Sequence, residues 1–150
     1  MTFQQKNVTV TLASFSLLLA IFLFRVTRLV RTENFNDSTV IRLWIFVVIF
    51  AIGVTVLGMI LTHGASAAFE FMRTGDENVE IDDVIDERDT LIDLKGTKTT
   101  YTISSFGSFF AIMAFALGQS ALVLISLLLF FGIAGQIAGD ARRLWLYQQG

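Results

Sequence analysis

The sequence predicts an all-α polytopic membrane protein, with four transmembrane helices and an acidic amphipathic helix between the second and the third. The composition is 54% hydrophobic and only 16% charged over 150 residues, which is too apolar for a soluble domain of this size. Three uncharged runs are also long enough to meet the roughly 20 apolar residues that a helix needs to cross a bilayer. Such segments must satisfy their backbone hydrogen bonds internally, so we expect each to be helical.

The longest uncharged run, residues 99–139, would form ~60 Å of helix and must therefore fold back once. Its weakest point for a helix is the sequence GQS that begins at Gly118. The first run is followed by Arg25 and Arg28, where a signal peptidase would need small residues, so we expect a retained span rather than a cleaved signal peptide. The predicted spans are residues 8–29, 41–64, 100–118 and 120–139.

These spans divide the chain into four parts. We expect a first transmembrane hairpin in residues 1–64 and a second in residues 100–139. An acidic juxtamembrane loop with an amphipathic helix is expected between them, in residues 65–99, and a short C-terminal tail in residues 140–150.

The acidic segment holds ten of the 13 acidic residues between Glu70 and Lys95, with three basic residues. Apolar residues recur there at helical spacing, and Arg88 lies among them with no acid three or four residues away. Two interpretations of Arg88 remain open. In the first, the aliphatic stem of Arg88 covers apolar surface while its guanidinium reaches water or lipid phosphate. In the second, the guanidinium pairs with an acid or a carbonyl elsewhere in the protein or on a partner. The outward acids would be repelled by anionic lipid, which favours protein as the binding surface of this helix.

The same segment carries a short motif. Asp86-Glu87-Arg88 is followed by Ile92, then by Lys95-Gly96 and directly by a predicted span. This pattern resembles the "DER…I..K-small" junction of an uncharacterised family of small bacterial and archaeal integral membrane proteins, over residues 84–118. The resemblance carries no activity. It implies that a set of residues acts together in docking to a partner: Asp86, Glu87, Arg88, Ile92 and Lys95.

Small residues recur three or four positions apart on the predicted spans, a pattern that lets helices approach closely in a membrane. On the third span they are Ser104, Gly107, Ala111, Ala114 and Gly118, and on the fourth they include Gly135 and Gly139. Two arrangements remain open. In one, the small residues of the spans pack against each other within an intramolecular four-helix bundle. In the other, the pair Gly135 and Gly139 contacts another subunit.

The sequence offers little for catalysis or for ligand chemistry. It has no cysteine and one histidine, His63, so we expect no thiolate site, no Ser-His-Asp set and no haem held by two histidines of one chain. It also lacks a calcium-binding loop and a Gly-rich phosphate loop. We therefore expect no enzymatic activity, no catalytic residue, no cofactor and no metal, and the net charge of −2 argues against nucleic acid as a partner.

Charge placement predicts the orientation. Seven of the 11 basic residues lie on the side of the two termini, which favours cytoplasmic termini in a bacterial cytoplasmic membrane. The predicted function is a non-catalytic accessory or structural subunit of a larger membrane assembly, with the bilayer and other membrane subunits or copies of itself as partners. The alternative is a channel or transporter subunit that forms a homo-oligomeric pore. It is second because no charged residue lies well inside a predicted span.

Overall fold

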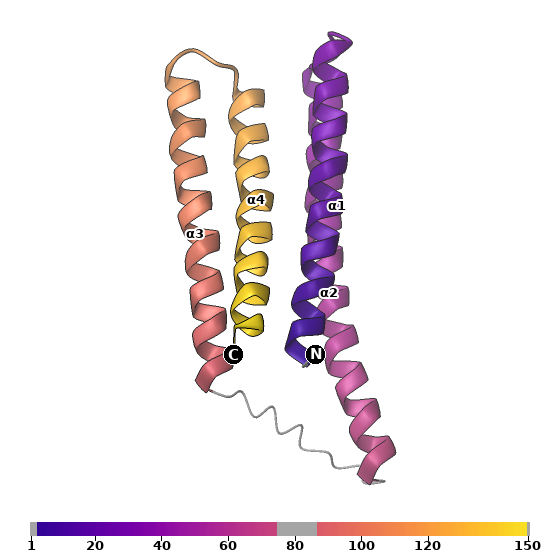
Figure 1. Ribbon diagram of the computed structural model, residues 1–150. Coiled ribbons are helices and arrows are strands. Elements are labelled where there is room, and N and C mark those ends of the chain that lie inside the picture. The colour runs from indigo at the N-terminus through magenta and orange to yellow at the C-terminus, as the bar shows by residue number, and fades with distance from the viewer. Residues whose placement is uncertain (1–2, 75–86, 150) are drawn as a thin grey trace.

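The computed structural model describes residues 3–74 and 87–149, with the backbone alone for residues 3, 58–59 and 61–74. This part of the chain consists of four helices, which confirms the all-α prediction (Figure 1). They are α1 (Phe3–Arg31), α2 (Asp37–Thr74), α3 (Glu87–Ala116) and α4 (Ala121–Gln148).

The connection between α1 and α2 is a tight turn whose ends are set by local hydrogen bonds. Glu33 adopts a left-handed conformation, with φ of 55°, just after α1 ends. The side-chain oxygen of Asn36 then accepts a hydrogen bond from the backbone N–H of Thr39 at 3.2 Å. This bond satisfies one of the free N–H groups at the start of α2, as an N-cap does.

The connection between α3 and α4 lies at the predicted fold-back. Gly118 has φ of +94°, a conformation that glycine adopts without steric cost. Ser120 then caps α4, because its hydroxyl accepts a hydrogen bond from the N–H of Val123 at 3.4 Å. The turn predicted at the GQS sequence is therefore confirmed.

Helix α4 is the central element of the structure. It packs against α3 on one side and against α1 on the other, while α2 packs against α1 and touches α4. Both hairpin turns lie at one end of the molecule, and the two termini lie together at the other end (Figure 1). In the described part of the chain α3 thus has α4 as its only helical neighbour.

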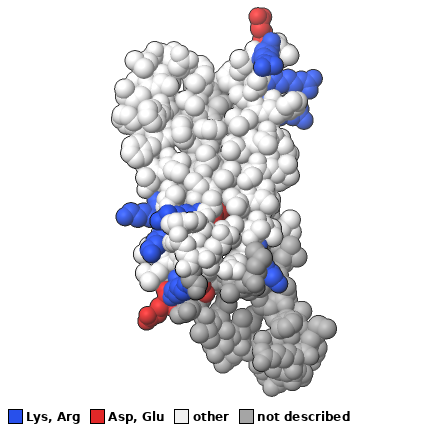
Figure 2. All heavy atoms as spheres, viewed as in Figure 1, with Lys and Arg blue, Asp and Glu red and all other residues white. Residues whose placement is uncertain are grey.

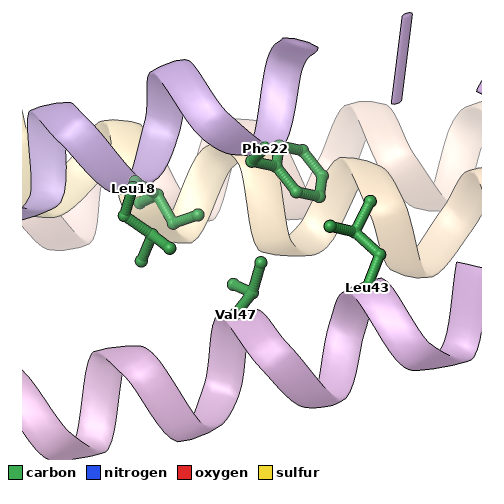
Figure 3. Close-up of a cluster of buried hydrophobic side chains, with 5 residues drawn as sticks. Leu18, Phe22, Leu43 and Val47 are labelled. Atoms are coloured by element: carbon green, nitrogen blue, oxygen red, sulfur yellow. The ribbon is translucent and has the colours of Figure 1, made fainter. Parts of the chain in front are cut away.

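The apolar core is small and lies where α1, α2 and α4 meet. Leu18 and Phe22 of α1 are one helical turn apart, as are Leu43 and Val47 of α2, and Ile133 of α4 completes the cluster (Figure 3). Many large apolar side chains point outward instead, on α2 and α3 above all. A hydrophobic exterior of this extent suits a lipid environment rather than water.

Three of the described helical segments are long and apolar enough to cross a membrane: Gln4–Arg31, Asp37–Leu57 and Ala121–Gln148. Figure 2 shows one group of charged side chains at the α1–α2 turn and the others over the half of the molecule that carries the termini, with uncharged surface between the two groups. Helix α3 is not among the three. Its first turns are charged, and it runs without a break through residue 100, where the sequence predicts the start of the third span. The first half of the predicted amphipathic helix, before Glu87, lies outside the described residues, and the segment of its second half forms the first turns of α3.

Candidate functional site

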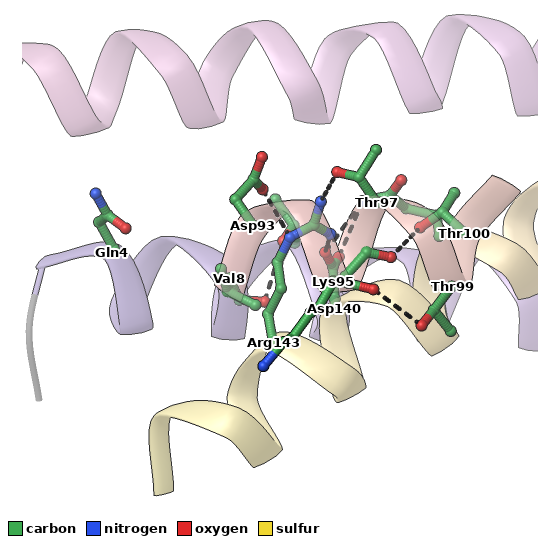
Figure 4. Close-up of polar contacts among 12 residues, drawn as sticks. Gln4, Val8, Asp93, Lys95, Thr97, Thr99, Thr100, Asp140 and Arg143 are labelled. Atoms are coloured by element: carbon green, nitrogen blue, oxygen red, sulfur yellow. Dashed lines mark hydrogen bonds and ion pairs between the residues drawn. The ribbon is translucent and has the colours of Figure 1, made fainter. Parts of the chain in front are cut away.

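A buried carboxylate lies near the end of the molecule that carries both termini (Figure 4). It belongs to Asp140 of α4, of which only 2% is exposed. Burial of an unpaired charge costs several kcal/mol or more, so such a group must be neutralised or hydrogen-bonded by its neighbours.

Two neighbours on the same helix satisfy the Asp140 carboxylate. Gln136 lies one turn earlier, and its amide nitrogen donates to the two carboxylate oxygens at 3.1 and 3.2 Å. Arg143 lies three residues later, and its Nη1 donates to Oδ1 at 2.9 Å. Residues three and four positions apart share one face of a helix, which explains why the three side chains meet. The hydroxyl of Thr11, on α1, also approaches the carboxylate.

Arg143 extends this cluster to α3. Its Nε forms an ion pair with Asp93 at 2.9 Å, and its Nη2 donates to the hydroxyl of Thr97 at 2.8 Å (Figure 4). The Asp93 side chain is 71% exposed, whereas that of Arg143 is only 13% exposed. The guanidinium therefore links a buried carboxylate on one helix to a solvent-facing carboxylate on the next through Nη1 and Nε, while its Nη2 binds the Thr97 hydroxyl.

Two further side-chain hydrogen bonds connect α4 to the remaining helices. The hydroxyl of Tyr147 donates to the side-chain oxygen of Gln4, on α1, at 2.7 Å. The indole nitrogen of Trp44, on α2, donates to the hydroxyl of Ser126 at 3.2 Å. Every buried side-chain nitrogen or oxygen atom in the described residues has a hydrogen-bond partner. The polar cluster is thus a satisfied network that fixes helices against one another.

The predicted small residues of α3 and α4 lie mostly at the interface between these two helices. Gly107 lies against Phe131, Gly135 lies against Ser104, and Gly139 lies against the Thr100 hydroxyl and the Gly96 carbonyl. Ala111 is fully buried and Ala114 is half-buried, while Gly118 lies in the turn. The pair Gly135 and Gly139 thus contacts α3 of its own chain.

Four of the five predicted docking residues lie on the first turns of α3, where Arg88, Ile92 and Lys95 share one face of the helix. Glu87, Arg88 and Lys95 are exposed, whereas Ile92 is buried. Asp86 lies outside the described residues. Arg88 forms no ion pair with any residue that the structure describes. The arginine that bridges the helices is Arg143, not Arg88.

The sequence pattern did not reveal this cluster, because the predicted fourth span ends at residue 139 and leaves Asp140 and Arg143 in the predicted C-terminal tail. Helix α4 continues to Gln148. The available signal was the helical spacing of Gln136, Asp140 and Arg143 across the end of the predicted span, with no glycine or proline in residues 140–149 to end the helix.

The described residues contain no group of three or more histidine, cysteine or acidic side chains that could hold a metal ion. The candidate site is the salt-bridged polar cluster that joins α3 to α4. Compared with known proteins, the chain matches no protein-family model, no curated protein and no solved structure.

Proposed function

We propose that this chain is a non-catalytic structural subunit of a larger membrane assembly, in which α3 is a fourth membrane span and carries the docking surface. The observation behind the proposal is the outer face of α3, which combines hydroxyl groups with large aromatic side chains and is covered by no other described helix.

The position of α3 beside α4 supports its role as a span. The two helices form a hairpin with a short turn, so α3 runs along the full uncharged length of α4. Between Lys98 and the turn, α3 carries no charge over residues 99–116, which corresponds to ~27 Å of helix. That length is close to the hydrocarbon thickness of ~30 Å.

The outer face of α3 carries a shallow, open groove of about 940 Å³ that is lined by residues of α3 alone. Thr102 and Ser105 contribute hydroxyl groups to it, and Phe106 and Phe109 contribute exposed aromatic rings. The Thr102 hydroxyl donates to its own helix, to the Lys98 carbonyl at 2.8 Å, and its oxygen can still accept a bond from a partner. Small hydroxyl residues are enriched where membrane helices pack together and form hydrogen bonds between them.

The outer face of α2 provides a contrast. Its exposed large side chains are mostly aliphatic and include Ile45, Ile49 and Ile52, as expected for a surface in contact with acyl chains, although Phe46 is also exposed. The partner that fits the α3 groove is therefore a transmembrane helix of another subunit or of a second copy, packed against Ser105 and Phe106.

Site-specific photo-crosslinking in native membranes tests the proposal. A photoreactive phenylalanine analogue at Phe106 should crosslink to protein, whereas the same analogue at Ile49 should react with lipid alone. Mild-detergent extraction and mass spectrometry would then show whether the crosslinked chain is a different subunit or a copy. If both positions gave only lipid adducts, the docking surface would be disproved.

One observation favours the alternative of a channel or transporter subunit. Asp140 is a buried ionisable residue inside the segment Ala121–Gln148, and such residues often lie on ion or proton paths. Its pairing with Arg143 and Gln136 fits a structural role better. Flux measurements in proteoliposomes test this alternative. Ion or proton flux through the parent chain that disappears in Asp140→Asn would favour transport, whereas the absence of flux in the parent chain would favour the structural role.

A further inference from the structure

We propose that the groove at the α1–α2 turn binds the phosphate of an anionic phospholipid through Arg25, Arg28 and Arg42. The groove has a volume of about 730 Å³, and its walls come from the last turns of α1 and the first turns of α2. This volume lies within the usual range of small-molecule sites.

The three arginines place a concentrated positive charge on one groove. Arg25 and Arg28 are three residues apart on α1, so they share a face of that helix, and Arg42 approaches from α2. All three are exposed. The acids nearest in sequence, Glu33 and Asp37, form no ion pair with them, so these guanidinium groups have no counter-ion among the described residues.

The depth of the arginines suits a lipid headgroup. Arg25 lies six residues before the end of α1, ~9 Å along the helix, and Arg42 lies five residues into α2, ~7.5 Å. Both are therefore at a similar distance below the turn. A guanidinium binds phosphate oxygens through two parallel hydrogen bonds, which a single lysine cannot do.

The bilayer side of the groove is apolar and extends toward the middle of the molecule, whereas Thr32, Asn34 and Thr39 line the groove near the turn. Ile21 lies one turn before Arg25, and Phe46 lies one turn after Arg42, so both are on the bilayer side of the arginines. An acyl chain would pack against these two side chains while its phosphate contacts the guanidinium groups. Free phosphate has no apolar part that could pack against this wall, so the wall favours a lipid as the occupant.

Isolated arginines near the ends of spans commonly reach the interface without binding any particular lipid. Such arginines need no shared groove. Here three of them, from two helices, line one groove that also has an apolar wall. Arg31 provides the internal control, because it is exposed at the same end of the molecule and does not line the groove.

Native mass spectrometry of the purified chain in mild detergent can measure lipid binding directly. The probes are phosphatidylglycerol and phosphatidylcholine with identical acyl chains, with inorganic phosphate as a competitor. We expect phosphatidylglycerol to bind about tenfold more tightly than phosphatidylcholine, and inorganic phosphate not to displace it. Equal binding of the two lipids, or displacement by phosphate, would overturn the proposal.

Glutamine variants locate the site. Arg25→Gln, Arg28→Gln and Arg42→Gln should each reduce the preference for phosphatidylglycerol, and the triple variant should abolish it. Arg31→Gln should keep the preference of the parent chain. An unchanged preference in the single variants, or an equal loss in Arg31→Gln, would show that the groove is not the site. The comparison of lipids on the parent chain does not depend on how the variants fold.

Discussion

The guanidinium of Arg143, on α4, occupies the space that a side chain at Gly96, on α3, would fill. A Cβ atom at Gly96 would lie 2.7 Å from Nε and 2.9 Å from Cζ of Arg143, closer than any real contact. Gly96 is itself buried, so the absence of its side chain lets Arg143 cross the interface and reach Asp93. A glycine of the juxtamembrane motif is therefore part of the polar cluster that joins α3 to α4.

This arrangement predicts unequal costs for removing the members of the cluster. Arg143→Ala should destabilise the fold by about 3–5 kcal/mol, because it leaves the buried carboxylate of Asp140 without its cation. Asp93→Ala should cost less than about 1 kcal/mol, since its carboxylate is mostly exposed. Reversible unfolding in detergent micelles, followed by circular dichroism, measures both.

Arg142→Ala is the matched control for this experiment. Arg142 is the exposed neighbour of Arg143 and lies over the ring of Trp145, with 4.3 Å from Cζ to the ring centroid. We expect it to cost about 0.5–1 kcal/mol. Equal losses for Arg142→Ala and Arg143→Ala would contradict a structural role of the cluster.

A second prediction concerns the close contact between α3 and α4. A methyl group at Gly107 would clash with Phe131, whereas a methyl group at Gly132, the next residue along α4, would meet no atom within 4 Å. Gly107→Ala should therefore destabilise the fold by about 1–3 kcal/mol. Gly132→Ala should be neutral or stabilising by up to ~1 kcal/mol, because alanine favours the helix. The same unfolding measurement tests both variants. If Gly107→Ala were more stable than Gly132→Ala, the result would contradict this interface.

The parts of the fold that depend on local sequence could be predicted. Uncharged runs place the helices, and Gly118 with Ser120 places the turn between α3 and α4, because both effects arise within a few residues. Small residues of α3 could also be named in advance. Their partners, such as Phe131 for Gly107, could not, because helical periodicity does not fix which faces of two helices meet.

The polar cluster depends on long-range contacts, which local patterns do not contain. Asp93 and Arg143 are 50 residues apart in the sequence, and only the hairpin of α3 and α4 brings them together. The sequence singles out Arg88 because no acid lies three or four residues away from it. Arg143 has Asp140 three residues before it on its own helix, so the sequence does not mark it as an unpaired charge. It is nevertheless the residue that bridges the two helices.

The orientation of the chain in the membrane is a third prediction, and it also decides which leaflet the arginine groove faces. If both termini are cytoplasmic, as the distribution of basic residues indicates, the α1–α2 turn lies outside. Single cysteines can report this directly, because the natural sequence has none. Glu33→Cys is an exposed site in the turn, and Gln149→Cys is exposed just after α4.

A membrane-impermeant maleimide should label Glu33→Cys in intact cells and should leave Gln149→Cys unlabelled until the cells are opened. Asn36 is a poorer site for this label, because its side chain caps α2. The opposite pattern would reverse the orientation and place Arg25, Arg28 and Arg42 at the cytoplasmic leaflet. Labelling of both sites in intact cells would contradict the arrangement in which the termini and the α1–α2 turn lie on opposite sides of the membrane.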